Sequence, residues 1–176
     1  PNGRLDVTKD SDTDYSATTD QRSSAQIIAR NGTAGTNNFA SISLVNGGGT
    51  QAEASINLIE TDDYLGDITF KSRTGATTWT EKMRIDASGR LLLGTTTEGD
   101  TAADNLTIAD SGASGITIRS GTTSTGNIYF SDATSGTGVY DGYIQYSQNT
   151  RHLTLGTATL ERLRIDSSGR LLLGAG

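Results

Sequence analysis

The sequence contains no cysteine, which excludes both a disulfide framework and a thiolate metal site. No apolar run approaches the roughly 18 residues of a membrane-spanning helix, so we expect no membrane insertion. Basic runs are also missing from a chain that carries a net charge of −6. Because nucleic-acid binding depends on Lys and Arg neutralising phosphates, we expect no nucleic-acid partner.

Large aliphatic and phenylalanine side chains are scarce. Ile, Leu, Val and Phe make up about 19% of the chain, near the level at which a packed core becomes difficult to build. The 14 basic and 20 acidic residues are interspersed, so charge repulsion is too weak to keep the chain unfolded. The rest is rich in Thr, Ser and the 22 Gly residues. This composition favours many short strands whose core is completed by oligomerisation.

Period-two patterns occur along most of the sequence, with apolar residues alternating with Thr, Ser or Asn. Such segments predict strands with one buried face, and they lie at residues 41–45, 54–59, 66–70, 106–108, 115–118, 126–130 and 143–146. Gly-rich turn clusters separate them. Only residues 25–30 are a helix candidate, and they fit a strand equally well. The pattern therefore predicts an all-β fold.

A fourteen-residue segment occurs twice. Residues 81–94 return as residues 161–174 with eleven identical positions, and Gly89 and Gly169 lie eighty residues apart. Internal repetition is typical of arrays and fibres, in which each unit buries its apolar face on a neighbour. We therefore predict two β-modules, residues 1–94 and 95–176, each ending in the repeated hairpin. Residues 2–7 echo residues 88–93, so we expect this chain to be a piece of a longer protein.

Each copy reads as a β-hairpin. Asp86 and Gly89, and likewise Asp166 and Gly169, have the residue types that favour a tight turn. The three leucines after each turn break the alternation, so both faces of that strand should be covered, most simply around a threefold axis. Glu81, Arg84, Asp86 and Arg90 carry mixed charges that could pair between chains and set their register. The predicted trimer core consists of Met83, Ile85, Leu91, Leu92, Leu93, Leu163, Ile165, Leu171, Leu172 and Leu173. An ordinary hairpin in a monomeric sandwich is the alternative.

The repeated motif, Glu-x-Met/Leu-Arg-Ile-Asp-Ala/Ser-Ser-Gly-Arg-Leu-Leu-Leu-Gly, resembles the repeat of bacteriophage tail fibres and tailspikes, of the kind often followed by an intramolecular chaperone. Residues 101–160 are more weakly similar to the module that often precedes this motif. The resemblance implies an elongated homotrimeric fibre of short-stranded β-modules, of the interwoven β-prism, β-sandwich or triple β-helix type. It also implies an extracellular location on the virion and contacts with other fibre or tail proteins. Nothing resembling the chaperone follows Gly174.

Tyr129, Tyr140, Tyr143 and Tyr146 form an aromatic cluster between the repeats, and are candidate contacts for a host-surface glycan. Alternation places Tyr129 on the face opposite Ile128, and Tyr143 on the face of Gln145. Exposed tyrosines also pack across strands without binding a ligand, so this role remains an alternative to a purely structural one.

Three other sets of polar residues are weaker candidates for chemistry. Asp10, Asp12 and Asp14 begin like a calcium loop, but Tyr15 and Gln21 replace its Gly and Glu, leaving an irregular cation site or a solvated loop. The single histidine, His152, is expected to be structural rather than part of a Ser-His-Asp set. Glu60, Asp62, Asp63 and Asp67 could pair for glycoside hydrolysis, although loop carboxylates are usually solvated.

The sequence therefore predicts a structural fibre segment that holds a receptor-binding part, with itself as main partner. We expect no enzymatic activity, no cofactor and no metal. The rival hypotheses are a glycan-binding module, a fragment of a polysaccharide-degrading tailspike, and a bacterial surface filament or adhesin.

Overall fold

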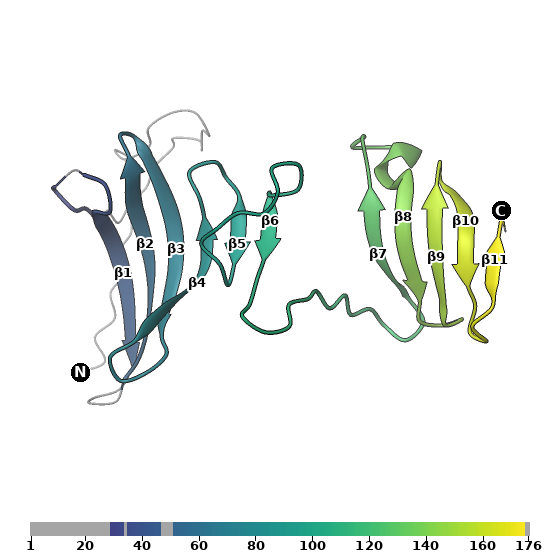
Figure 1. Ribbon diagram of the computed structural model, residues 1–176, viewed down its shortest axis with the longest axis horizontal. Coiled ribbons are helices and arrows are strands. Elements are labelled where there is room, and N and C mark those ends of the chain that lie inside the picture. The colour runs from purple at the N-terminus through teal and green to yellow at the C-terminus, as the bar shows by residue number, and fades with distance from the viewer. Residues whose placement is uncertain (1–28, 34, 47–50, 175–176) are drawn as a thin grey trace, which may run out of the picture. The chain divides into compact units, whose positions relative to one another are not determined.

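The computed structural model describes residues 29–33, 35–46 and 51–174, and shows an all-β chain built of two sheets (Figure 1). The all-β prediction is confirmed. The candidate cation loop at Asp10–Asp14, the echo at residues 2–7 and most of segment 25–30 lie outside the described residues. The one helical element in the described part is the short 3-10 helix η2 (Thr137–Tyr140). No helix there has the length and apolar character needed to cross a membrane.

The first sheet contains six strands whose order in space follows their order in sequence. They are β1 (Phe39–Asn46), β2 (Ala52–Asp62), β3 (Leu65–Arg73), β4 (Trp79–Ile85), β5 (Leu91–Leu93) and β6 (Leu106–Ile108). Neighbours pair antiparallel, except that β6 lies parallel to β5. A parallel pair needs a longer connection than a tight turn, and residues 94–105 provide it.

The second sheet is an antiparallel meander of five strands, in the order β11-β10-β9-β8-β7 (Figure 1). The strands are β7 (Thr125–Phe130), β8 (Gly142–Ser147), β9 (His152–Thr157), β10 (Leu160–Ile165) and β11 (Leu171–Leu173). Among the described residues, β11 has a partner on one side only and forms an edge of the sheet.

The chain divides into two compact units between Ser114 and Gly115. We refer to them as unit 1 and unit 2. This division differs from the boundary predicted after Gly94. The physical reason is β6, which adds to the edge of β5 through backbone hydrogen bonds from Leu91 N to Asn105 O (2.9 Å) and from Ala109 N to Leu93 O (2.9 Å). Residues 95–109 thus complete the first unit.

The structural repeat is longer than the sequence repeat. In unit 1, one row of cross-strand partners runs Asn57, Thr69, Arg84, Leu92 over β2 to β5. In unit 2 the corresponding row runs Gln145, Thr154, Arg164, Leu172 over β8 to β11. The five strands β7 to β11 therefore repeat β1 to β5, although only the last two strands and their turn are nearly identical in sequence.

Both copies contain a β-bulge at the same position. The register shifts where Lys71 pairs with Glu81 while Phe70 pairs with Met83, so Lys82 is the extra residue. In the second copy the shift lies between Glu161 and Leu163. A bulge turns a side chain to the other face of the sheet. It therefore brings Glu81 onto the face of Arg84, and Glu161 onto the face of Arg164, where simple alternation would separate them.

Candidate assembly surface

One face of the first sheet is apolar on all six strands. Directly opposed residues share a face, so the strand registers define this apolar face of unit 1. It consists of Ala40, Ile42, Leu44, Ala54, Ile56, Leu58, Ile68, Phe70, Met83, Ile85, Leu91, Leu93, Leu106 and Ile108. Two complete rows cross the sheet, one through Met83 and one through Ile85.

The second sheet has an equivalent apolar face of unit 2. Its members are Ile128, Phe130, Ile144, Tyr146, Leu153, Leu155, Leu163, Ile165, Leu171 and Leu173. The row through Leu163 contains Ile128, Ile144, Leu155 and Leu173, and so matches the row through Met83 in unit 1. The predicted core residues other than Leu92 and Leu172 therefore all lie on these two apolar faces.

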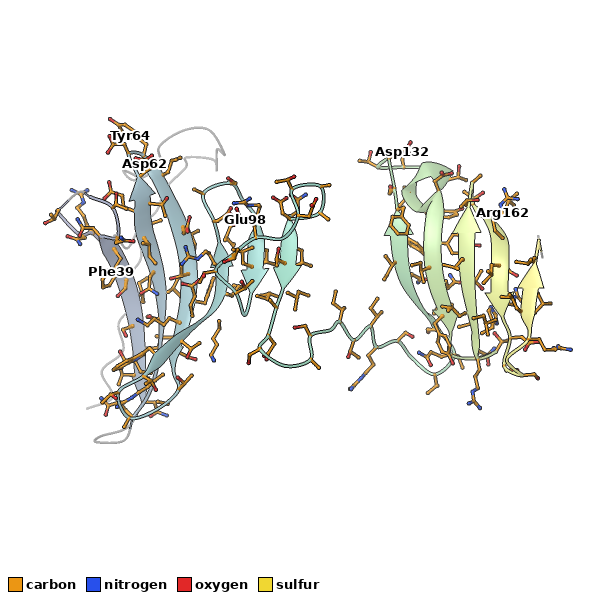
Figure 2. The ribbon with its side chains drawn as sticks, viewed as in Figure 1. Phe39, Asp62, Tyr64, Glu98, Asp132 and Arg162 are labelled. Carbon is orange, nitrogen blue, oxygen red and sulfur yellow. The ribbon has the colours of Figure 1, made fainter. Side chains whose placement is uncertain are left out.

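Neither apolar face is covered within the described chain. Leu44 is 66% exposed, Leu58 54% and Ile42 52%, while Leu92 is the one fully buried large aliphatic residue among those described. Figure 2 shows the side chains standing out from both sheets. Contiguous exposed apolar surface of this kind marks an interaction site in a soluble protein. A sheet with one apolar face needs a second layer to form a core, and here the second layer has to come from outside the described residues.

The leucines after the first turn do not all point the same way. Leu91 and Leu93 lie on the apolar face, whereas Leu92 lies on the opposite face beside Arg84 and Thr107. Leu92 is only 1% exposed, because it lies between Arg84 of β4 and Thr107 of β6, and Thr96 of the loop that follows β5 lines the same hollow. The chain itself therefore covers Leu92, which differs from the prediction that this side chain faces partner chains.

The face opposite the apolar one carries polar groups that satisfy each other within the chain. Asn57 Nδ2 donates to Thr69 Oγ1 (3.2 Å), and both residues are buried. In unit 2, Gln145 Nε2 donates to Asn127 Oδ1 (2.7 Å). Buried polar groups that have a partner avoid most of the cost of losing water. Apart from Leu92, the buried side chains of these sheets are thus mainly polar, and many of the large apolar ones are exposed.

The mixed charges of the first hairpin, expected to pair between chains, have partners within the chain. Arg84 donates through Nε and Nη2 to the two carboxylate oxygens of Glu81 (2.8 Å each), and through Nη1 to Asp67. Hydrogen bonding to Glu81, opposed by partial burial and reinforced by Asp67, raises the pKa of Arg84 above its usual range. The bulge at Lys82 makes the Glu81 pairing geometrically possible.

The hairpin turn is held by one aspartate in each copy. Asp86 Oδ1 accepts hydrogen bonds from the backbone N–H groups of Ser88 and Arg90 (2.9 Å each), and Oδ2 accepts from Arg90 Nε (2.6 Å). Gly89 closes the turn with φ of 81° and an N–H bonded to Asp86 O (2.9 Å). Burial alone would raise the pKa of Asp86, but the bonds from Arg90 and Ser88 outweigh it and lower the pKa below its ordinary value.

The second turn repeats these contacts. Asp166 accepts from the N–H groups of Ser168 and Arg170 (2.9 Å each) and from Arg170 Nε (2.7 Å), and Gly169 has φ of 80°. The backbone bond from Arg170 is the largest of the effects that lower the pKa of Asp166. The predicted turn residues thus occupy equivalent positions in both hairpins.

The four tyrosines do not form one cluster. Tyr129 and Tyr140 lie together, with ring centroids 6.1 Å apart, and are 48% and 40% exposed. Tyr143 is on the face of Tyr129, but its ring covers Gly156, where a Cβ atom would lie 2.0 Å from it. Tyr146 belongs to the apolar face on the other side of the sheet. Only Tyr129 and Tyr140 therefore remain together as a candidate platform for a flat ligand.

The weaker candidate residues have local structural partners. His152 lies at the start of β9, with Nδ1 2.6 Å from Thr150 Oγ1. Glu60 accepts a hydrogen bond from Gly35 N (2.8 Å), and Asp67 accepts one from Ala87 N (2.8 Å) in addition to its bond with Arg84. Over the ranges that the structure describes, no group of three or more His, Asp or Glu residues is arranged to hold a metal ion.

Comparisons with known proteins give little similarity. No protein-family model matches the sequence, and no curated protein matches it. The structure is similar to the carboxy-terminal domain of the bacteriophage T5 L-shaped tail fibre, with 13% sequence identity and a TM-score of 0.35. The likeness covers 93% of this chain and 91% of that chain. A TM-score of 0.35 is too low to establish a common fold, so the chain's own residues have to carry any functional proposal.

Proposed function

We propose that this chain is a structural segment of a bacteriophage tail fibre, located on the virion outside the cell, where it assembles as a homotrimer and spaces a receptor-binding part. The observation that supports the proposal best is the continuous apolar face that crosses every strand of both sheets. The resemblance of the repeated hairpin to tail-fibre repeats favours a fibre over other assemblies. In this role the chain has no catalytic site, and its partners are its own copies and other tail proteins.

The residues that face partner chains in this proposal are those of the two apolar faces. They include Met83, Ile85, Leu91 and Leu93 in unit 1, and the equivalent Leu163, Ile165, Leu171 and Leu173 in unit 2. Each large aliphatic side chain that becomes fully buried contributes roughly 1.5–3 kcal/mol. Because two mainly apolar rows cross each sheet, burial between chains can offset the entropy cost of ordering a chain with almost no core of its own.

Two adjacent residues of β1 provide a matched test. Ile42 is on the apolar face and Ser41, which is also exposed, is on the opposite face. Ile42→Asp places a charge in the proposed interface and should dissociate or aggregate the oligomer, whereas Ser41→Asp should leave its mass unchanged. Sedimentation velocity measures both. A wild-type chain that sediments as a compact monomer at micromolar concentration would contradict the proposal, as would equal behaviour of the two variants.

The position in a virion needs a separate measurement. Antibodies against the chain should label the tail fibres of phage particles that contain it, as seen by electron microscopy, and should slow adsorption to host cells. Labelling confined to bacterial filaments would support the rival hypothesis of a surface adhesin, even if the chain is trimeric.

A second candidate function is glycan binding at the Tyr129 and Tyr140 pair, which is exposed and lies outside the apolar face. Aromatic rings favour contact with the apolar face of a sugar ring. Tyr129→Ala should remove binding on a glycan array, whereas Tyr146→Ala, on the other side of the sheet, should not. A wild-type chain that binds no glycan on the array would leave these tyrosines with a packing role only.

A further inference from the structure

The edge of β11 has the same structure as the edge of β5, but among the described residues no strand is added to it. In unit 1, β6 adds to β5 in parallel, with Leu91 opposite Leu106, Leu92 opposite Thr107 and Leu93 opposite Ile108. In unit 2 the corresponding edge, Leu171–Leu173, has no strand beside it among the described residues (Figure 1). Edge strands with unpaired backbone groups are ready templates for strand addition.

The side chains around the two edges also correspond. Arg90 contacts Asp86, Asp104 (3.0 Å) and Glu98 (3.5 Å), and its side chain is 22% exposed. Arg170 makes the equivalent contact to Asp166, but its side chain is 76% exposed. Figure 2 shows Glu98 on the loop that follows β5. The segment that covers β5 therefore brings two carboxylates to the arginine, and Arg170 offers the same charge at an open edge.

Two further positions differ between the covered edge of β5 and the edge of β11. Leu92 is 1% exposed under the covering segment, whereas Leu172 is 37% exposed. Gly94 has φ of 72°, and a Cβ atom there would lie 2.2 Å from Ala109 O, so only glycine allows β6 to approach. Gly174 has nearly the same backbone, with φ of 65°, but nothing lies within 4 Å of its Cβ position. No described residue of unit 2 thus occupies the space that Ala109 takes in unit 1.

The segment that covers β5, residues 95–109, has internal contacts that determine which of its side chains face the edge. Gly99 N donates to Thr107 Oγ1 (3.0 Å), and Ala103 N donates to Asp100 O (2.8 Å), so the loop folds back on its own strand. This arrangement places Asp104 beside the turn arginine at the start of β6, and directs Leu106 and Ile108 to the apolar face.

From these correspondences we propose that β11 is an acceptor site for a polypeptide strand of the type Asp-x-Leu-x-Ile. This strand adds in parallel, with its aspartate on Arg170 and its Leu and Ile extending the apolar face of unit 2. The backbone groups of Leu171 and Leu173 bind the added strand, Arg170 binds its aspartate, and the exposed side chain of Leu172 packs against it. The proposal does not depend on trimer formation, because all of these groups belong to one chain.

The probe is a synthetic peptide with the sequence of residues 95–110, titrated against the full-length chain. Binding should protect the amides of Leu171 and Leu173 from hydrogen exchange. Arg170→Glu should weaken binding by about tenfold, since it replaces a charge-assisted contact by repulsion. Arg119→Glu, which makes the same charge change near the opposite edge of the sheet, should leave binding within about twofold. No binding, or equal loss in both variants, would overturn the proposal.

The register is tested by crosslinking, which the absence of native cysteine makes unambiguous. Leu172→Cys in the chain should form a disulfide with a peptide carrying Thr107→Cys, because these positions correspond to the Leu92 and Thr107 pair. A peptide with the cysteine at position 105 should crosslink much more slowly. Preferred crosslinking at position 105, or an antiparallel pattern in a series of peptides, would overturn the parallel geometry.

Discussion

The two copies of the hairpin have nearly the same sequence and the same backbone hydrogen bonds, yet their leucines are in different environments. Leu91 and Leu93 are half-buried and Leu92 is fully buried, whereas Leu171, Leu172 and Leu173 are all exposed. Residues 95–109 cover the first hairpin, and among the described residues no segment takes the same place beside the second. The motif thus specifies a turn and a pair of strands, and the neighbouring segment decides how much of it is buried.

The largest expected effect separates the central leucines. Leu92→Ala removes a buried side chain and should lower the free energy of unfolding of unit 1 by about 2–5 kcal/mol. Leu172→Ala removes a partly exposed one and should cost unit 2 under about 1.5 kcal/mol in the monomeric chain. Hydrogen exchange followed separately in each unit measures both. Equal losses would mean that Leu172 is covered in solution, and would remove the contrast between the copies.

The glycines that follow each leucine strand should differ by a smaller amount. Alanine at either position carries the cost of a left-handed backbone, about 1–2 kcal/mol. Gly94→Ala must in addition displace the carbonyl of Ala109, so it should detach β6 and raise the exchange rates of the Leu106 and Ile108 amides. Gly174→Ala should leave the rest of unit 2 unchanged. Normal protection of β6 in Gly94→Ala would show that the strand can shift to accommodate a methyl group.

The smallest effect concerns the turn aspartates, and it tests whether the two turns are stabilised in the same way. Asp86 and Asp166 both have a lowered pKa in the folded chain. Their contribution to stability is therefore present above the unfolded pKa of about 3.9 and is lost as the pH falls through the lower folded value. Asp86→Asn and Asp166→Asn should each weaken their own unit at pH 7 and reduce its further loss on acidification. An unchanged acid dependence in either variant would assign that loss to other carboxylates.

The strands and the hairpins could be predicted from the sequence because alternation and turn chemistry are local. The turn formed by Asp86 and Gly89 needs only a few neighbouring residues. Alternation also placed Tyr129 on the face opposite Ile128, and Tyr143 on the face of Gln145, as the structure has them. Glu81 lies on the same face as Arg84, as expected, but strict alternation would separate the two, and nothing in a period-two pattern marks the extra residue of the bulge.

The other differences from prediction depend on contacts that are distant in sequence. The run of three leucines predicts that both faces of the strand are covered, so Leu92 is assigned to the trimer core with Leu91 and Leu93. The sequence does not show which of the two faces is covered by the same chain. The pairing of β6 with β5 moved the unit boundary from Gly94 to Ser114 for the same reason. The sequence did contain a signal for this pairing. The alternating segment Asn105-Leu106-Thr107-Ile108 follows Glu98 and Asp104, which are possible acidic partners for Arg90.

Strand order has a consequence for how the protein forms. In both sheets every strand pairs with the strands next to it in sequence. Such short-range pairings close small loops, which favours fast formation of each sheet. In the proposed assembly the apolar faces gain their cover from other copies of the chain, and that step is bimolecular. Folding of the separate chain and completion of its core are therefore two kinetic events, and only the second slows on dilution.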